Sequence, residues 1–323
     1  KKLLNFKMRH SLRIIYMAGG ASYTLNPLKV ILESKHNLVH VYTKYPKPSG
    51  RGKKILTNPL QEFLEEKEIP FSYPKNFKSE EEINKIINLK PDIILVFSYG
   101  NILPKAILDI PKWGCINIHA SLLPKWRGAA PVQYSLLNNE KETGFSIMIM
   151  NEQVDEGKIL YKKVVKIENN DDYKSLLNKL IELASFSILD VIENFVQGII
   201  KPIEQNHKLA TYAHIIKKHE TYLDFNESAD KILGKIRAFN PNPGAKCFIN
   251  GELVRIIKAK KEIFKKNNCK PGTILDNKLL ISCKLDGVRP IIVQRAGKKP
   301  LKLSEALNGW KIIPGTLIKS KLQ

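Results

Sequence analysis

The chain has 323 residues, of which 43% are hydrophobic and 26% are charged. That length allows two domains, each with its own core, and the composition excludes extended disorder. No apolar run approaches the roughly 18 residues that a membrane-spanning helix needs, so we expect no association with a membrane. The four cysteines are irregularly spaced without a CxxC pair, which indicates free thiols in a reducing cytoplasm rather than disulfides or a metal site.

The net charge indicates the kind of partner to expect. It is +22 in total, although 45 of the 53 basic side chains are lysines, which a genome-wide compositional bias would also produce. The distribution is more informative, because residues 1–200 carry a net charge of +7 whereas residues 201–323 carry +15. An excess in the last third favours a polyanionic partner over a merely solvated surface.

The N-terminal segment does not fit a signal peptide. Arg9, His10 and Arg13 interrupt what would be its apolar core, so Leu12–Met17 is better interpreted as a first strand. Met8 is a candidate for the natural start, which would make Lys1–Lys7 an extension.

The first half of the chain alternates strands with amphipathic helices. Apolar, β-branched runs predict strands at Leu12–Met17, Leu38–Thr43, Asp92–Ser98, Cys115–His119, Thr143–Met150 and Gly157–Ile167. Helical patterns lie at Asn26–Ser34, Pro59–Lys67, Ser79–Asn88 and Asp172–Phe195. This alternation predicts an α/β fold with a doubly wound, mostly parallel sheet.

A linker and a second, smaller domain are expected to follow. Periodicity is lost between Gln197 and Thr221. After a helix at Ser228–Ala238, short strands are predicted at Ala245–Ile249, Glu252–Lys258, Gly272–Leu275, Leu279–Lys284 and Pro290–Gln294, a pattern typical of a small β-barrel. The expected division is a domain at residues 8–204, a linker at residues 205–221 and a second domain at residues 222–318.

Candidate catalytic groups gather around the strand Cys115–His119. Asn117 and His119 stand two apart on it, and therefore on one face, at the carboxyl end where ligands of open α/β sheets bind. Asp155 follows the next hydrophobic run and completes a carboxamide, imidazole and carboxylate set. An amide can donate to a developing oxyanion, and a His–Asp pair can move a proton. A lone His at a strand end is more often a satisfied core group, so it is the combination that predicts an enzyme.

No nucleophile accompanies this set. Ser121 follows His119 closely, but no GxSxG elbow surrounds it, and Cys115 is interpreted as a packing residue. Met17–Gly20 does not complete GxGxxG and no Walker A loop is present, so a nucleotide cofactor has little support. We therefore expect direct transfer between two bound substrates, without a covalent acyl-enzyme.

A second candidate site is the basic loop Ser49–Lys54. Its glycines allow close approach of the backbone, and Arg51, Lys53 and Lys54 are suited to contact phosphates. The spacing alone leaves a solvated charged loop as the alternative.

Together, these motifs resemble those of the 10-formyltetrahydrofolate-dependent formyltransferases. The resemblance extends over nearly the whole chain and rests on NIHASLLPKWRGAAP (residues 117–131), VDEG (154–157), FSYGNILP (97–104), ETGFSIMIM (142–150), IRAFNP (236–241) and PGTI (271–274). The Ser49–Lys54 loop and the basic C-terminal part make the chain similar to those members that act on methionyl initiator tRNA.

The resemblance implies a Rossmann-like domain joined to an OB-like, tRNA-binding barrel. It implies Asn117, His119 and Asp155 as the catalytic trio, and 10-formyltetrahydrofolate as the formyl donor. The residues implied to bind tetrahydrofolate are Ser121, Leu122, Leu123, Pro124, Phe97, Tyr99, Gly100, Ile102, Leu103, Met150 and Val154. Those implied to contact the acceptor end of the tRNA are Arg51, Lys53 and Lys54. We expect a cytoplasmic monomer without a metal.

The mechanism that this implies is direct attack by the α-amino group of methionyl-tRNA on the formyl carbon. Asn117 and protonated His119 would stabilise the oxyanion. Asp155 would hold His119 charged and help to remove the proton of the amine.

One loop departs from the family pattern. After the first strand the family usually has F-x-G-T-P-x-F-A, whereas Tyr16–Thr24 is YMAGGASYT. Because this loop borders the active-site cleft in the family, altered affinity or lowered activity is one alternative. The others are formylation of an amino sugar nucleotide, hydrolysis of formyltetrahydrofolate, and a non-catalytic RNA-binding homologue.

Overall fold

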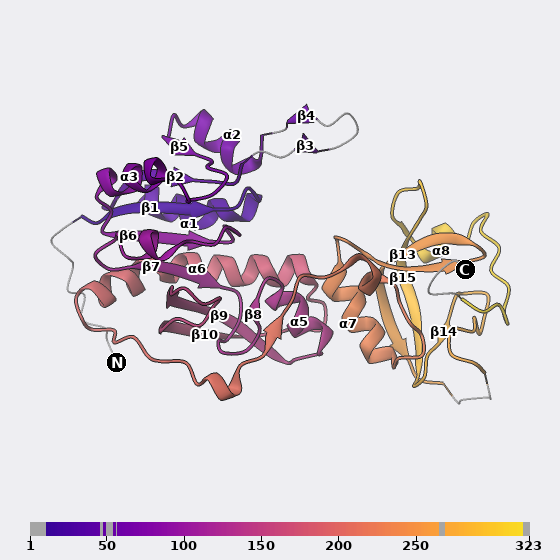
Figure 1. Ribbon diagram of the computed structural model, residues 1–323. Coiled ribbons are helices and arrows are strands. Elements are labelled where there is room, and N and C mark those ends of the chain that lie inside the picture. Colours follow the sequence, from indigo (N-terminus) through magenta and orange to yellow (C-terminus); the bar gives the residue numbers. More distant parts are fainter. Residues whose placement is uncertain (1–10, 46–47, 50–53, 56, 265–268, 319–323) are drawn as a thin grey trace. The chain divides into compact units, whose positions relative to one another are not determined.

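The structure is a computed structural model that describes residues 11–45, 48–49, 54–55, 57–264 and 269–318 (Figure 1). The chain divides into two compact units. The first comprises residues 1–127, 144–165 and 178–212, and the second comprises residues 128–143, 166–177 and 213–323. The domain and linker boundaries expected at residues 204 and 222 stay a prediction.

The first unit is built on a seven-stranded sheet with the strand order β10-β9-β7-β6-β1-β2-β5. The strands are β1 (Arg13–Ala18), β2 (Asn37–Tyr42), β5 (Phe71–Ser72), β6 (Ile93–Phe97), β7 (Cys115–His119), β9 (Glu142–Ile149) and β10 (Ile159–Lys166). The pairings from β5 to β7 are parallel, and β9 runs antiparallel to β7. β1 and β6 are buried almost throughout, as strands covered on both faces should be. The predicted α/β fold with a mostly parallel sheet is confirmed.

Helices connect the parallel strands. They are α1 (Leu25–Leu32), α2 (Pro59–Glu66), α3 (Glu80–Leu89) and the short α4 (Lys105–Leu108), and the long α6 (Tyr173–Val196) follows β10. The start of α2 is fixed by a capping box, in which the Asn58 side chain accepts from the backbone of Gln61 and the Gln61 side chain accepts from the backbone of Asn58. Pro59 takes the first helical position, where its missing N–H costs nothing.

The strand order reverses between β1 and β6. From β1 the chain adds β2 and β5 on one side and then returns to add β6 and β7 on the other, which creates a topological switch point where ligands of such sheets bind. The segments that follow β1 and β6 meet there, because the Gly19 N–H donates to the Phe97 carbonyl at 3.4 Å. A Cβ on Gly19 would lie 2.5 Å from the Ser98 carbonyl oxygen, so only glycine fits this contact. β7 lies directly beside this point.

The second unit contains an antiparallel sheet in the order β12-β13-β15-β14, with β16 paired to β15. Its elements are α5 (Pro131–Leu137), α7 (Ala229–Phe239), β12 (Ala245–Ile249), β13 (Glu252–Glu262), β14 (Ile281–Ser282), β15 (Gly287–Arg295), β16 (Leu301–Lys302) and α8 (Leu303–Ala306). Asn250 and Gly251 both have positive φ, 51° and 76°, which suits the tight hairpin between β12 and β13. Among the described strands no pairing joins β12 to β14, so the expected OB-like domain is a curled half-barrel.

Several elements differ from the predictions. The strand predicted at Gly272–Leu275 forms only two isolated bridges, and the one predicted at Leu279–Lys284 is shortened to Ile281–Ser282. The physical reason is Asp276, whose carboxylate accepts from the backbone of Lys278 and Leu280 and folds the intervening chain into a turn.

The region predicted as a linker contains regular structure of its own. It holds the 3₁₀ helices η2 (His207–Leu209) and η3 (Lys218–Thr221), and β11 (Tyr212–Ala213), which pairs with β8 (Arg127–Gly128). None of the helices in the described part of the chain is long and apolar enough to cross a membrane.

Candidate active site

Asn117 and His119 lie on β7 between β6 and β9. Asn117 pairs with Val96 on β6 and with Met148 on β9, and it is half-buried. Its side-chain amide makes no hydrogen bond within the described part of the chain, so its N–H groups are available to an acceptor from outside. His119 is 6% exposed, two residues further along the strand.

Both ring nitrogens of His119 face oxygen atoms. Nε2 lies 2.9 Å from the Trp126 carbonyl, which can only accept, so Nε2 carries the proton of that hydrogen bond. Nδ1 lies 3.5 Å from Oδ2 of Asp155, whose side chain is 13% exposed. A neutral ring would therefore turn a lone pair toward the carboxylate, whereas an imidazolium ring would turn an N–H toward it. Nδ1 is therefore the ring nitrogen through which His119 and Asp155 can interact.

Asp155 lies on a tightly constrained turn. Its φ is +55°, in the left-handed region that residues other than glycine rarely adopt. Two residues later the backbone approaches β9 so closely that a Cβ on Gly157 would lie 1.7 Å from the Ile149 carbonyl oxygen. The glycine of the VDEG motif is therefore required by packing, because only glycine lets the turn that holds Asp155 lie this close to β9.

We expect Gly157→Ala to lower the free energy of unfolding by roughly 3 kcal/mol, because the added methyl group must displace backbone. Gly309→Ala is a comparison in open space, since its Cβ would meet nothing within 4 Å. Its φ is +87°, so it reports a left-handed backbone cost of about 1–2 kcal/mol, which Gly157, without a positive φ, does not carry. Urea denaturation measures both. Equal losses in the two variants would contradict the packing role.

The turn after β7 is held by a hydroxyl network. The Ser121 hydroxyl donates to the Lys125 carbonyl at 2.5 Å and is fully buried. The Ser146 hydroxyl donates to the Ser121 carbonyl at 2.7 Å and accepts from the Leu123 N–H at 3.0 Å, and the Leu123–Pro124 bond is cis. The Ser121 hydroxyl is thus used within the turn, and its predicted contact with tetrahydrofolate stays a prediction.

The residues predicted to bind tetrahydrofolate divide into buried and exposed ones. Tyr99 and Leu103 belong to one core cluster, against which the partly buried Met150 packs. Ile102 and Val154 are instead 84% and 65% exposed, so their apolar side chains are open to a ligand. Of the other members, Phe97 and Leu123 are buried, Leu122 and Pro124 are half-buried in the segment after β7, and Gly100 is exposed in the segment after β6.

Burial changes the titration of two groups at this edge of the sheet. It raises the pKa of the Cys115 thiol to about 12, so that this cysteine is a neutral packing residue. It also raises the pKa of the Tyr99 hydroxyl above its usual value. Among the described residues no group of three or more His, Cys, Asp or Glu side chains could hold a metal ion.

The loop that departs from the family pattern is well supported. The Thr24 hydroxyl donates to the Gly19 carbonyl at 2.8 Å, and the buried Tyr16 hydroxyl donates to the Thr24 carbonyl at 2.7 Å. Tyr23 packs its ring edge-on against Phe97 at 5.9 Å and lies 3.2 Å from the Ser98 hydroxyl. The altered sequence therefore forms an ordered contact with the end of β6.

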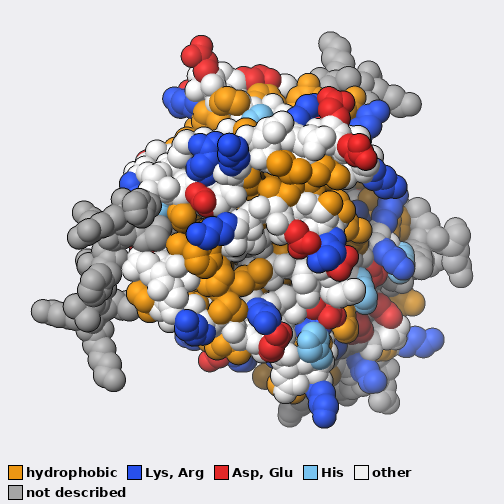
Figure 2. Space-filling model, turned by 60° about the vertical axis from the view of Figure 1, so that its left-hand side comes forward, with side chains coloured by type: hydrophobic (Ala, Val, Ile, Leu, Met, Phe, Trp, Pro, Cys, Tyr) orange, Lys and Arg blue, Asp and Glu red, His pale blue; other side chains and the backbone are white. Residues whose placement is uncertain are grey.

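The predicted tRNA-contacting residues Arg51 and Lys53 lie outside the described residues, as does the side chain of Lys54. The structure describes the flanking two-residue strands β3 (Pro48–Ser49) and β4 (Lys54–Ile55), which pair antiparallel. On the face shown in Figure 2, the described basic side chains are interspersed with acidic and apolar ones. The described residues of that face thus form no continuous basic surface.

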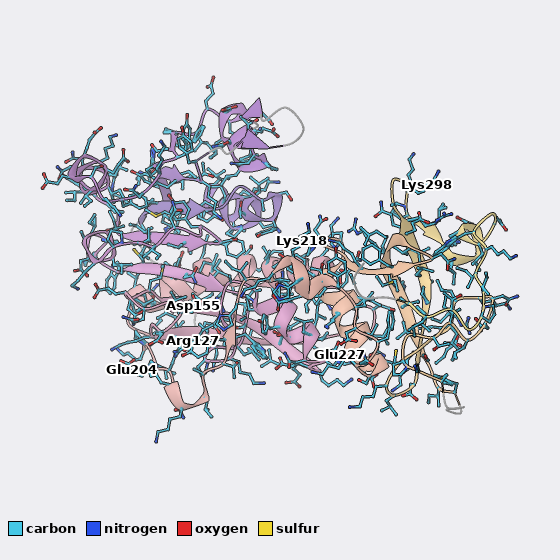
Figure 3. All side chains as sticks on the ribbon, turned by 45° about the vertical axis from the view of Figure 1, so that its right-hand side comes forward. Arg127, Asp155, Glu204, Lys218, Glu227 and Lys298 are labelled. Carbon is cyan, nitrogen blue, oxygen red and sulfur yellow. The ribbon has the colours of Figure 1, made fainter. Side chains whose placement is uncertain are left out.

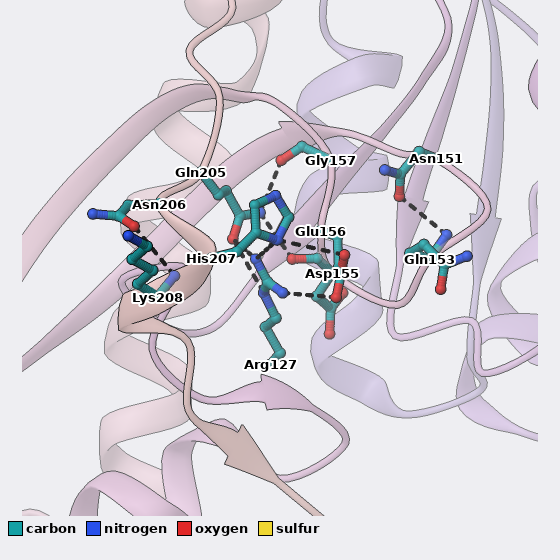
Figure 4. Close-up of polar contacts among 10 residues, drawn as sticks. All are labelled: Arg127, Asn151, Gln153, Asp155, Glu156, Gly157, Gln205, Asn206, His207 and Lys208. Carbon is teal, nitrogen blue, oxygen red and sulfur yellow. Dashed lines mark hydrogen bonds and ion pairs between the residues drawn. The ribbon is translucent and has the colours of Figure 1, made fainter.

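Three residues next to Asp155 were not singled out from the sequence. Arg127, Glu156 and Gln205 form a hydrogen-bonded cluster around its backbone (Figure 4). The signal available in the sequence was weak: Arg127 is a charged residue among the small residues of WRGAAP, and nothing pointed to Gln205.

Comparison with known proteins identifies the family of this chain. The formyl transferase family model matches residues 12–192, and that of the formyl transferase C-terminal domain matches residues 215–311. The chain belongs to the formyl transferase family. Two related proteins are the methionyl-tRNA formyltransferases of Ehrlichia canis (strain Jake) and Pseudoalteromonas translucida (strain TAC 125). The first is 41% identical over 94% of this chain and 98% of its own length, and the second is 36% identical over 96% and 98%.

Solved structures share the fold of this formyl transferase at low sequence identity. HypX from Aquifex aeolicus, in complex with tetrahydrofolic acid, matches with a TM-score of 0.62 at 17% identity over 93% of this chain and 47% of HypX, so the chain spans about half of HypX. WlaRD, a sugar 3N-formyl transferase solved with dTDP and 5-N-formyl-THF, matches with a TM-score of 0.64 at 19% identity over 90% of this chain and 100% of WlaRD.

Proposed function

We propose that this chain transfers the formyl group of 10-formyltetrahydrofolate to the α-amino group of methionyl initiator tRNA, as a step of translation initiation in the cytoplasm. The observation that carries the proposal is the unpaired amide of Asn117 beside the His119–Asp155 pair, whose Nδ1 and Oδ2 lie 3.5 Å apart. The methionyl-tRNA formyltransferases that resemble it at 36–41% identity over most of its length support the choice of acceptor.

The donor supplies an activated formyl carbon, and the residues at hand suit its binding. A pterin ring needs an apolar surface with a few polar groups. Exposed Ile102 follows the core residue Tyr99 by three positions, and exposed Val154 follows Met150, which packs against that core, by four. Asn117 supplies amide N–H groups that no other described residue uses. No metal is required for this chemistry.

In the proposed mechanism, three side chains act on the formyl oxygen and on the amine. Asn117 donates to the oxygen as negative charge develops on it, and the positive charge of protonated His119 stabilises that charge. This is the electrostatic contribution that dominates many acyl transfers. Asp155 keeps His119 oriented and positively charged and helps to remove the proton of the attacking amine. Because Ser121 is fully buried and its hydroxyl donates to the Lys125 carbonyl, this hydroxyl is not assigned as an acceptor of the formyl group.

Part of the second unit suits a polyanion. Lys246 has its pKa lowered first by burial and then by the positive charges of Arg255 and Lys218, so three cations gather there. The rings of Tyr222 and Phe248 stack at 6.0 Å beside them, on the residues that bridge to or adjoin Lys246. Basic and aromatic side chains together are typical of surfaces that bind nucleic acids.

Arg51→Ala is expected to raise KM for methionyl-tRNA and to leave KM for the formyl donor unchanged. If Arg51 contacts a phosphate, its removal lowers the slope of log KM against log salt for methionyl-tRNA by about 0.7–0.9. Steady-state kinetics at several salt concentrations measure this. Unchanged tRNA kinetics would mean that the loop is ordinary surface.

The acceptor is tested with one formyl donor. We would measure kcat/KM for methionyl initiator tRNA and for an amino sugar nucleotide, and the rate of hydrolysis of the donor by water. We expect efficient transfer to the tRNA alone. Preferred transfer to the sugar or to water would replace the proposed acceptor, and tRNA binding without transfer would indicate a non-catalytic homologue. The expected monomeric state is a separate prediction, which sedimentation measures.

A further inference from the structure

A buried arginine lies beside the trio, next to Asp155 (Figure 3). The Arg127 side chain is 1% exposed, and each of its three guanidinium nitrogens has a hydrogen-bond partner. Nη1 donates to Oε1 of Glu156 at 2.8 Å, while Nε and Nη2 both donate to Oε1 of Gln205, at 3.2 and 2.9 Å. Nη2 also lies 3.3 Å from Nδ1 of His207. A buried cation is tolerated only where its hydrogen bonds are satisfied in this way, so the cluster has a defined geometry.

Gln205 connects this arginine to the backbone around Asp155. Its Nε2 donates to the Asp155 carbonyl and to the Gly157 carbonyl, both at 2.8 Å (Figure 4). The carboxamide is thus used completely, with its oxygen accepting twice from Arg127 and its nitrogen donating twice to the turn. A carboxylate in the same place would face two carbonyl oxygens with no proton to donate.

Asp155 needs such support for two reasons. Its left-handed backbone costs roughly 1–3 kcal/mol and persists only where surrounding contacts hold it. Its Oδ2 lies 3.5 Å from Nδ1 of His119, which exceeds a hydrogen bond by a few tenths of an ångström. A small displacement of the Asp155 peptide therefore decides whether the carboxylate can pair with the imidazole.

The dipeptide Trp126–Arg127 also contacts the imidazole of His119. The Trp126 carbonyl accepts from Nε2 of His119 at 2.9 Å, and Trp126 directly precedes Arg127. One dipeptide thus binds the ring of His119 through its first residue and the turn of Asp155 through its second. His119 and Asp155, the two groups that must move a proton, are thus both held by contacts that involve Trp126–Arg127.

We infer that Arg127 and Gln205 are positioning residues, which hold the Asp155 carboxylate against His119 by fixing the carbonyls of Asp155 and Gly157 in the turn. The inference rests on the proposed function, since it takes His119 and Asp155 as acting groups. Neither Arg127 nor Gln205 touches the reacting atoms, so both act through Asp155.

Gln205→Glu tests this, because it keeps the size of the side chain and removes its two N–H donors. We expect kcat for formyl transfer to fall by about 10²-fold, the order of loss that a misplaced catalytic group causes, while KM for the formyl donor and the affinity for tetrahydrofolate stay unchanged. The amide hydrogens of residues 154–158 should exchange faster, while those of β6 and β7 stay protected. Gln197→Glu is the control, with the same chemical change eight residues earlier in the same unit and wild-type behaviour expected.

Arg127→Lys gives a second test that does not depend on how Gln205→Glu folds. Lysine retains the positive charge, but its ammonium group cannot replace the planar guanidinium that donates to Glu156 and twice to Gln205. We therefore expect kcat to fall again at constant KM and the amide hydrogens of residues 154–158 to exchange faster. Unchanged kcat and exchange in either folded variant would overturn the inference. So would parallel losses of kcat, tetrahydrofolate affinity and melting temperature, which indicate a purely structural role. Absence of formyl transfer by the wild-type chain would instead refute the proposed function, whereas the exchange result stands without activity.

Discussion

Replacing Asn117 by alanine is expected to lower kcat for formyl transfer by roughly 10²–10³-fold, the loss typical of an oxyanion donor. The side-chain amide has no partner within the described part of the chain, so it contributes little to stability and is free to donate to the formyl oxygen. The melting temperature should therefore stay near that of the wild type while turnover is lost. Single-turnover transfer of a labelled formyl group to methionyl-tRNA measures the effect.

Two further variants make this result specific. Asn117→Asp keeps the shape but removes the donor and adds negative charge, so it should be at least as inactive as the alanine variant. Asn37→Ala removes the same side chain from an exposed position at the start of β2 and should be silent. Turnover near the wild-type level in either Asn117 variant would remove this residue from the mechanism.

Asp155→Asn is expected to lower kcat by about 10²–10⁴-fold, the range of general acid–base contributions. Because Nε2 of His119 already donates to the Trp126 carbonyl, the carboxylate faces Nδ1, where a second proton makes the ring cationic. A neutral amide at this place stabilises that cation less well and cannot accept the proton of the amine. Tetrahydrofolate affinity, measured by equilibrium binding, should be preserved.

The matched control for this variant is Asp109→Asn. Asp109 is an exposed carboxylate on the first unit that pairs with Lys105 at 3.0 Å, and such surface pairs contribute little to stability. It should leave kcat and melting temperature unchanged. If Asp155→Asn retained the kcat of the wild type, the His119–Asp155 pair would be a structural feature and the mechanism would need another base.

The sequence predicted those helices and strands whose ends are set by neighbouring residues. β7 and β12 begin and end at the predicted residues, because their apolar or alternating residues end at turns. The predicted helix at Pro59–Lys67 agrees with α2 to within one residue, since Asn58 and Gln61 form its capping box. By contrast, α5 was not predicted. It begins at Pro131 after a run of small residues, and this pattern resembles a loop, although proline is favoured at the first helical position.

The site was predictable to the same extent. The two-residue period of a strand predicts that Asn117 and His119 share a face, and this depends on β7 alone. The cluster around Asp155 was not predictable, because Arg127 and Gln205 are 78 residues apart and meet only in the folded chain. The left-handed backbone of Asp155 likewise has no sequence signal, since it is imposed by Gly157 and Gln205 rather than by its own preference.

The central claim is that the formyl group passes directly from the donor to the amine of methionyl-tRNA at Asn117, His119 and Asp155. A rapid-quench single turnover with a formyl-labelled donor tests it most directly, with the label followed on the tRNA and on the denatured protein. The account predicts that label appears on methionyl-tRNA with no burst of protein-bound formyl group. A stoichiometric formyl-protein adduct that forms and decays before the tRNA is labelled would contradict it.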